Sequence, residues 1–500
     1  MKSLVVSYFF AICSGTLMFL SMPSYHVGIL AWFGLVPLLI AIKDKSSNHQ
    51  YLLIHVTCMI WSLGTHIWYP SIFSGWGYLI IIGAGFFYGA MIKMGVDMQA
   101  RIKRWYGIFA LSITFSFFEW LKTSIPFTKT WWIEIISKSQ WMIPENLQIL
   151  SVTGFIGLSF LILLTNVVIA EIIKNQFSSK KIRIFTYSLL ILPIANFIYG
   201  TVIMNENNKQ LIEQAITIGA TVDLVNQDEE VLSLGNDQTA GDGYLADTYK
   251  MKEKIFEINQ ELSQNIMEEK SAEFIVWGEN EFMNLNDTEL IYQFQHLAKL
   301  LKTTIIADTV WETKDVMYDS AYMVNANGEE IGRTPKIFTL WGEESYGFSS
   351  GPRDYPVYET PFGKVALAVC WDRHDVAILR NYAKHGAQLV MIPADDDFYG
   401  DKRFPYFEAS DAVFRAVENH IAIGSGSTSG VAQVITPYGE MTAMSNVNTR
   451  QYIIGDTFTV DQQTFYTRFG DVFAYLFGMI FLVMLIVSER NKRGIEIADK

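Results

Sequence analysis

Three residues whose side chains could act together in covalent catalysis stand at or just after predicted strands. Glu279 follows the apolar run 274–277, Lys336 follows the run 331–335, and Cys370 ends the run 365–369. A thiolate can attack a carbonyl carbon, a carboxylate can take the thiol proton, and a lysine can balance the oxyanion that forms. The three residues therefore predict a Glu–Lys–Cys site with Cys370 as nucleophile and Glu279 as base.

Each of these residues has a simpler explanation when it is considered alone. A cysteine in a strand is more often a small core residue, and Glu279 and Lys336 could be ordinary loop residues. We expect Cys370 to lead into a helix over 374–385, whose free amides and dipole would favour the thiolate. His374 is an alternative partner for the thiol, but its position at the start of that helix favours a surface role.

The block 204–462 alternates strand and helix patterns, which predicts an α/β layered domain that places reactive groups at strand ends. Asn327-Gly328 and Pro437-Tyr438-Gly439 read as hairpin turns. Strands are expected at 215–222, 273–277, 303–308, 321–324, 364–370, 388–392, 421–425 and 431–436. Helices are expected at 245–268, 287–301, 374–385 and 406–420.

The first 203 residues and the segment 470–487 are far more apolar than this block. Half of all residues are hydrophobic and 18% are charged. A membrane-spanning helix needs about 20 mainly apolar residues. Runs of this kind predict about eight spans, with seven in an N-terminal bundle over 1–203 and the last in 470–500, on either side of the domain 204–469. They lie at 4–20, 27–42, 51–69, 78–97, 106–121, 155–173, 184–203 and 470–487.

The positive charges that flank these runs predict the orientation of the chain. Lys and Arg recur at 43–45, 93–104, 174–183 and 490–493, whereas the loops 21–26 and 70–77 contain neither residue. The pattern predicts cytoplasmic termini and an extracytoplasmic 204–469 domain. The 122–150 loop, which contains three lysines, does not fit this pattern. A signal peptide at the N-terminus is disfavoured because no small-x-small cleavage site follows the first run.

Several other classes of function are disfavoured by composition. The net charge of −13 and the absence of a basic stripe argue against nucleic acid as a partner. Residues 424–430 do not fit Gly-x-Ser-x-Gly, so a serine hydrolase is not supported. Asp395–Asp397 could suggest a cation, but consecutive residues do not converge on one ion, and we expect neither metal nor cofactor. The spans lack the buried charges of an ion pathway, which disfavours a transporter.

The Trp-rich loop 122–150 is either an aromatic belt or a device that shapes lipid access.

The motifs around the three residues resemble the nitrilase, or carbon–nitrogen hydrolase, superfamily. Strand-Trp-x-Glu is followed by Gly-x-x-x-Lys after a hairpin, and then by Pro-Phe-Gly-Lys-Val-Ala-Leu-Ala-Val-Cys-Trp-Asp at 361–372. The apolar part is similar to the bacterial apolipoprotein N-acyltransferase family at 30–39, 119–121 and 147–166, and Lys336 to Glu343 is similar to that family's Lys…Phe-Gly-Glu loop. The resemblance covers nearly the whole chain.

This resemblance implies an αββα sandwich and an enzyme that moves an acyl chain from a phospholipid, such as phosphatidylethanolamine, to a diacylated lipoprotein. It implies that Cys370 carries the acyl chain as a thioester, that Glu279 is the base and that Lys336 stabilises the oxyanion. Glu343 would support Lys336 and the base. The residues implied to shape the pocket are Trp371, Asp372, Phe398 and Tyr399.

The chain departs from the family pattern at several positions. Trp-Pro-Glu is Trp277-Gly278-Glu279, Cys-Tyr-Glu is Cys370-Trp371-Asp372, the loop 395–400 is more acidic, and a Ser/Gly run occupies 425–430. A Gln-Gly-Asn run is missing near 225–227. These changes leave three alternatives to lipoprotein acylation: a membrane-tethered amidase, an acyltransferase for another amine, or a catalytically silent lipid-binding homologue.

Overall fold

The computed structural model describes residues 2–131, 134–175, 177, 179–235, 248–279, 283–396 and 401–498. The chain divides into two units, residues 1–202 with 469–500, and residues 203–468. Each unit is described by itself.

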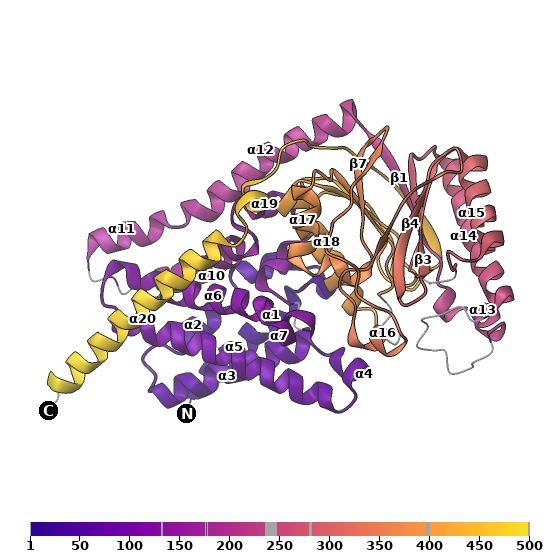
Figure 1. Cartoon of the computed structure of the whole chain (residues 1–500). Coiled ribbons are helices and arrows are strands. Elements are labelled where there is room, and N and C mark those ends of the chain that lie inside the picture. The colour runs from indigo at the N-terminus through magenta and orange to yellow at the C-terminus, as the bar shows by residue number, and fades with distance from the viewer. Residues whose placement is uncertain are drawn as a thin grey trace. The chain divides into compact units, whose positions relative to one another are not determined.

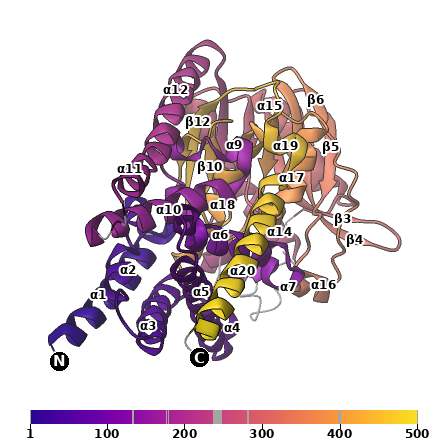
Figure 2. The same ribbon diagram turned by 90° about the vertical axis from the view of Figure 1, so that its left-hand side faces the viewer.

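The first unit is a bundle of helices. Its central contacts join α1 (Lys2–Leu20) to α3 (Ser47–Thr65), α3 to α5 (Trp76–Arg101), and α5 to α6 (Ala110–Ser124). The C-terminal helix α20 (Val472–Ala498) packs against α5 and α6 of the same unit (Figure 2). The other helices are α2 (Val36–Ala41), α4 (Tyr69–Phe73), α7 (Pro126–Trp131), α8 (Pro144–Leu147), α9 (Leu150–Thr153), α10 (Phe155–Lys174), α11 (Lys180–Ser188) and α12 (Ile191–Glu213), with short 3-10 turns that include η4 (Ile136–Gln140).

Four helical segments among the described residues are long and apolar enough to cross a membrane. They are Trp76–Arg101, Phe155–Lys174, Lys180–Glu213 and Val472–Lys492. Two shorter apolar helices, Leu4–Leu20 and Gly28–Ala41, coincide with the first two predicted spans. The count of eight spans stays a prediction.

The expectation that the spans lack buried charges is wrong. Glu119 and Lys122 of α6 are buried inside the bundle, together with His66 and Glu134, whose side chains form an ion pair at 3.1 Å between Nε2 and Oε2. Glu119 accepts hydrogen bonds from the amide of Ile136 and the hydroxyl of Ser159, both at 2.6 Å. These residues were overlooked because the runs around them are apolar on average. Buried charges are tolerated in such segments where they are paired.

These charges hold part of the 122–150 loop within the bundle. Residues 134–141 are all buried, and the Lys122 ammonium donates to the carbonyl oxygen of Glu134. Trp141 is buried as well, so its ring does not take part in an exposed aromatic belt. The side chains of Trp131 and Trp132 lie outside the described residues. Irregular backbone of this kind is tolerated at membrane depth only where protein covers it.

The second unit is an α/β domain with two six-stranded sheets, as the strand–helix alternation predicts (Figure 1). The first sheet has the order β12-β1-β2-β3-β4-β5 and the second β11-β10-β9-β8-β7-β6. The strands are β1 (Ile216–Val222), β2 (Phe274–Val276), β3 (Thr304–Glu312), β4 (Met317–Val324), β5 (Glu330–Pro335), β6 (Tyr358–Thr360), β7 (Gly363–Leu367), β8 (Leu389–Ile392), β9 (Ala422–Ser425), β10 (Gln433–Ile435), β11 (Met441–Met444) and β12 (Gln451–Thr457).

The two sheets pack face to face, with helices on their outer faces. Strand β1 contacts β9 and β10 of the other sheet, α14 (Tyr249–Glu269) packs on β1 and β12, and α18 (Phe404–Asn419) packs on β9 and β10. α15 (Thr288–Leu301) joins α14 on one side (Figure 1), and α17 (Val376–Lys384) joins α18 on the other. The short helices α13 (Glu229–Ser233), α16 (Trp341–Ser345) and α19 (Phe465–Phe469) complete the described elements.

The parallel strands explain why the reactive residues can meet. β1, β2 and β3 are mutually parallel in one sheet, and β7, β8 and β9 are parallel in the other. Three of these strands are short and fully buried along their length, namely β2, β8 and β9, and the first two are entirely apolar. Residues that follow the carboxyl ends of such strands are held at a fixed edge of the sheet.

Candidate active site

Each of the three predicted residues lies just after the end of a strand. Glu279 comes three residues after β2, Lys336 directly after β5, and Cys370 three residues after β7. The backbone ties these segments together, because the amide of Glu279 donates to the carbonyl oxygen of Ala394 at 3.1 Å and that of Cys370 to Pro393 at 2.9 Å. The segment after β8 thus holds both the carboxylate and the thiol.

Lys336 is the centre of a buried cluster of carboxyl groups. Its ammonium lies 2.6 Å from Glu279 Oε1, 2.5 Å from Glu343 Oε1 and 3.0 Å from Asp319 Oδ2. All four side chains are at most 6% exposed. Because one ammonium cannot neutralise three buried carboxylates, this cluster must carry protons.

The electrostatics of the cluster suit Glu279 to act as a base. Burial raises the pKa of Glu279 to about 8, Lys336 opposes this rise, and Asp319 and Glu343 add to it. Against the effect of burial, the three carboxyl groups hold the pKa of Lys336 well above its usual range. A carboxyl group that titrates near neutrality beside a permanent cation is suited to receive and return a proton.

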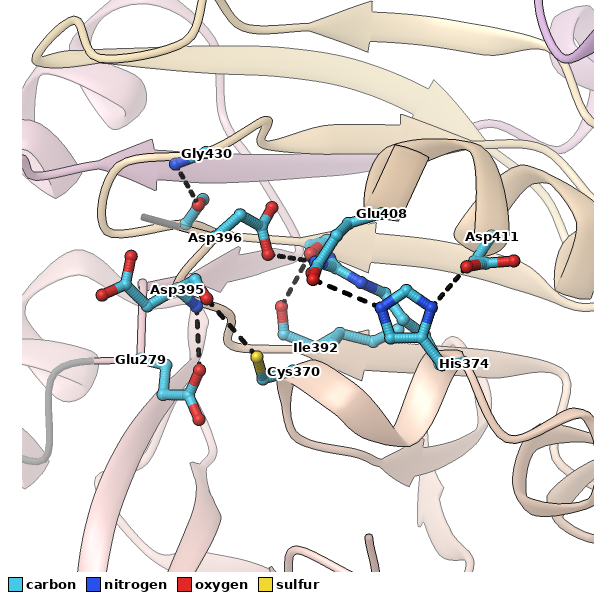
Figure 3. A network of polar contacts seen from close by, with 12 residues as sticks. Glu279, Cys370, His374, Ile392, Asp395, Asp396, Glu408, Asp411 and Gly430 are labelled. Carbon is cyan, nitrogen blue, oxygen red and sulfur yellow. Dashed lines mark hydrogen bonds and ion pairs between the residues drawn. The ribbon is translucent and has the colours of Figure 1, made fainter. Parts of the chain in front are cut away.

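The sulfur of Cys370 lies beside the segment that fixes Glu279. Its thiol donates to the carbonyl oxygen of Asp395 at 3.5 Å, and the amide of Asp395 donates to Glu279 Oε2 at 2.8 Å (Figure 3). Cys370 has φ +41°, in the left-handed region that residues with a side chain seldom adopt. Such strain is found at functional sites, where the surroundings hold it in place.

The expected helix dipole at Cys370 is absent from the described structure. Cys370 begins a 3-10 turn, Cys370–Arg373, and the following helix α17 starts only at Val376. Burial and the nearby Glu279 raise the pKa of the thiol, which Lys336 opposes. The expected help from a helix N-terminus is therefore missing, and the thiol needs a base when it attacks.

Asp372 braces the loops on either side of the cluster. Its carboxylate accepts hydrogen bonds from the amides of Ile337 at 3.0 Å, Phe338 at 2.7 Å and Val369 at 3.1 Å. Burial raises the pKa of Asp372 to about 7, against these donors. The carboxylate thus joins the segment after Lys336 to the strand before Cys370. Trp371 is buried and its ring stacks on Phe404, with centroids 6.1 Å apart.

The structure does not bring every candidate to the thiol. His374 faces Glu408 at 3.3 Å through Nε2 and Asp411 through Nδ1, so both ring nitrogens point to carboxylates of α18 and not to Cys370. Asp395 accepts from Ser429 at 2.8 Å, whereas Asp396 pairs with Arg373, so these two neighbours diverge. Asp397, Phe398 and Tyr399 lie outside the described residues.

Sequence reasoning missed the carboxyl groups that come from strand interiors. Asp319 lies on β4 and Asp308 on the paired strand β3, and both are buried. A charged residue within an otherwise apolar strand is the signal that could have identified them. Two sets of ligand atoms converge within 4.8 Å, Glu279 with Asp319 and Glu343, and Cys370 with Asp396 and Glu408. In each set a cation of the chain, Lys336 or Arg373, already pairs with the carboxylates.

Known proteins match both parts of the chain. Residues 14–168 match the model of the apolipoprotein N-acyltransferase N-terminal domain, and residues 245–462 match the carbon–nitrogen hydrolase model. An apolipoprotein N-acyltransferase from Geobacter metallireducens is 25% identical over 94% of this chain and 92% of that protein. One from Thermotoga maritima is 21% identical over 98% of this chain and 96% of that protein.

Among solved structures, an amidase from Nesterenkonia sp. aligns with a TM-score of 0.40 and 16% identity, over 51% of this chain and 92% of the amidase. The two matched regions occur in one chain, and the two acyltransferase relatives align with it along nearly their whole length. In both of its parts the chain is therefore similar to the apolipoprotein N-acyltransferases, and its second unit is similar to the carbon–nitrogen hydrolases.

Proposed function

We propose that this chain is a membrane acyltransferase that moves an acyl chain from a phospholipid to the N-terminal diacylglyceryl-cysteine of lipoproteins. The observation that carries the proposal is the position of Lys336 between Glu279 and Glu343, with the Cys370 thiol on the segment that fixes Glu279. The similarity to apolipoprotein N-acyltransferases supports lipoprotein N-acylation, and the geometry supports the route by which it proceeds.

In the first half-reaction Glu279 takes the proton of the Cys370 thiol while the sulfur attacks the ester carbonyl of the phospholipid. The negative charge that forms on the carbonyl oxygen is balanced by Lys336, whose ammonium the surrounding carboxyl groups keep protonated. When the carbon–oxygen bond breaks, Glu279 returns the proton to the leaving alkoxide. The products are a lysophospholipid and a thioester on Cys370.

In the second half-reaction the α-amine of the lipoprotein cysteine attacks the thioester. Glu279 takes a proton from the amine nitrogen, Lys336 again balances the oxyanion, and the carbon–sulfur bond breaks to give the amide. The proton then returns from Glu279 to the Cys370 sulfur. Because the donor product leaves before the acceptor reacts, the kinetics are expected to be ping-pong. Glu343, 2.5 Å from Lys336, orients the ammonium throughout.

The membrane arrangement is part of the proposal. We infer about eight spans in the cytoplasmic membrane, seven in 1–203 and one in 470–500, with the 204–469 domain on the outer face. The recurrence of Lys and Arg in alternate loops supports this orientation. An outer-face domain would meet both the phospholipids of that leaflet and lipoproteins after export.

Trapping of the acyl-enzyme tests the donor and the nucleophile. The full chain in detergent, incubated with labelled phosphatidylethanolamine, should acquire a thioester-linked label that hydroxylamine removes. The Cys370→Ala variant should remain unlabelled. An unlabelled wild-type protein would refute the phospholipid-donor proposal.

A second candidate is an amidase or an acyltransferase for another amine that uses the same residues. The sequence Cys370-Trp371-Asp372 favours it, as do relatives named N-carbamoylputrescine amidase from Solanum lycopersicum, 29% identical over 21% of this chain and 35% of that protein. Addition of a diacylated lipopeptide to the labelled enzyme separates the two. Transfer of the label to the peptide as an amide supports the first proposal, and equally fast discharge by water or a simple amine supports the second.

A further inference from the structure

A second buried ion cluster lies behind Cys370, separate from Lys336. The guanidinium of Arg373 pairs with both Asp396, in the segment after β8, and Glu408 of α18. His374 extends the cluster from Glu408 to Asp411 on the same helix (Figure 3). Arg373, Asp396 and Glu408 are fully buried.

The cluster fixes the strained turn that carries the sulfur. Arg373 and His374 follow Cys370 by three and four residues, and their partners come from two other segments of the domain. Trp371 lies against His374, with ring centroids 4.2 Å apart. A turn held from both sides can keep Cys370 at φ +41°.

The cluster also determines which charged groups lie beside the Cys370 sulfur. Carboxylate oxygens of Asp396 and Glu408 and the Cys370 sulfur all lie within 4.8 Å of one another. Burial opposes ionisation of Glu408, but Arg373 and His374 hold its pKa below the usual range. Burial and Glu408 raise the pKa of Asp396, although Arg373 opposes the rise. One negative charge therefore stays on Glu408, beside the cation of Arg373.

We propose that Arg373 and Glu408 are positioning residues for Cys370, with Arg373 favouring and Glu408 opposing ionisation of the thiol. This role rests on the proposed function of Cys370 as nucleophile. Among the described residues, Glu279 after β2 and Lys336 after β5 also act on the sulfur, and these belong to the first cluster. The Arg373 cluster thereby places one cation and one carboxylate beside the sulfur, with opposite effects on its ionisation.

The pH dependence of Cys370 alkylation measures this role without any acyl donor. The full-length protein in detergent would be treated with iodoacetamide from pH 6 to pH 11, and modification of the Cys370 peptide followed by mass spectrometry. A unit charge about 5 Å away, at an effective dielectric constant of about 20, shifts a midpoint by about two pH units. Glu408→Gln should move the midpoint to lower pH by on the order of one unit, and Arg373→Met should move it to higher pH.

Opposite shifts from two substitutions in one cluster distinguish electrostatics from a loss of packing. Glu418→Gln is the matched control, because it removes a carboxylate from another fully buried ion pair of α18, Arg415–Glu418 at 2.8 Å, and should leave the midpoint unchanged. Glu408→Gln keeps an oxygen for Arg373, so it tests the proposal even if Arg373→Met does not fold. An unchanged midpoint in Glu408→Gln, or a shift to higher pH, would overturn the proposal. The acyl-enzyme assay is read separately, so failure of the phospholipid-donor proposal would not be confused with this outcome.

Discussion

Gly278 is the position where the smallest substitution should have the largest effect on the site. A Cβ at residue 278 would lie 2.5 Å from the amide nitrogen of Thr428 and 2.6 Å from the carbonyl carbon of Ser427. Carbon contacts normally lie at about 3.5–4.0 Å, so Gly278→Ala requires one of the two backbones to move by roughly 1 Å. Both atoms are backbone, and a change of rotamer cannot relieve the contact.

That displacement acts directly on the base. The Thr428 hydroxyl donates to the carbonyl oxygen of Glu279 at 2.6 Å, and its amide donates to Ala394 at 2.9 Å, next to the Asp395 amide that holds the Glu279 carboxylate. Overpacking of this kind costs about 1–3 kcal/mol of unfolding free energy. Misplacement of a reacting group by about 1 Å costs on the order of 100-fold in rate.

Single-turnover formation of the thioester from labelled phosphatidylethanolamine, together with thermal unfolding in detergent, measures both effects. We expect Gly278→Ala to remain folded and to form the acyl-enzyme about 100-fold more slowly. Gly342→Ala is the control, since a Cβ there meets no atom within 4 Å although the residue adjoins Glu343. A Gly278→Ala variant that reacts at the wild-type rate would refute the argument that this close approach positions Glu279.

Three further predictions follow from the two units. Acyl-enzyme formation should rise with pH through about 8, because burial raises the pKa of Glu279 to that value and only the ionised form accepts a proton; in Glu279→Gln this rise should vanish and the rate should fall by at least about 100-fold. Asp372→Asn should lower the unfolding free energy, measured by denaturation, by about 1–3 kcal/mol, because its amide cannot accept all three N–H groups. Glu119→Ala should expose the 134–141 segment, so that a cysteine placed at the buried Ser137 becomes reactive to maleimide; continued protection would contradict the anchoring role of Glu119.

The sequence was most informative where one physical signal dominated. Short apolar runs bounded by Gly and Pro predicted eight of the strands to within a few residues, since buried parallel strands have few alternatives. Strand β12 was not predicted, because its pairing with β1 joins residues far apart in the chain and depends on the finished sheet. The helix expected at 374 begins at 376, after a turn that Asp372 and Arg373 stabilise through contacts with distant residues.

The candidate site was predictable in its three central residues and not in their surroundings. Glu279, Lys336 and Cys370 were recognisable because each follows a strand and the order of the three is distinctive. The contact of Asp319 with Lys336 was not predictable, because only the pairing of β4 with β5 brings its carboxylate to the ammonium. The buried charges of α6 were missed for a similar reason, since hydropathy averages over a window and cannot register a charged residue whose partner lies in another segment.

Two departures from the family pattern, at 278 and at 425–430, describe one change in packing. Gly278, which stands where the family has proline, lies against the backbone of Ser427 and Thr428. From the other side, a Cβ at Gly426 would lie 2.4 Å from the carbonyl oxygens of Val276 and Trp277, so a side chain at either glycine would separate the segments. Gly430, at the end of the same Ser/Gly run, approaches Asp396 so closely that a Cβ would overlap its carboxylate. The run therefore supports the Glu279 base on one side and the Arg373 cluster on the other. Because the two departures face each other, restoring the proline at 278 alone should impair the site, and its effect should depend on the residues at 427–430.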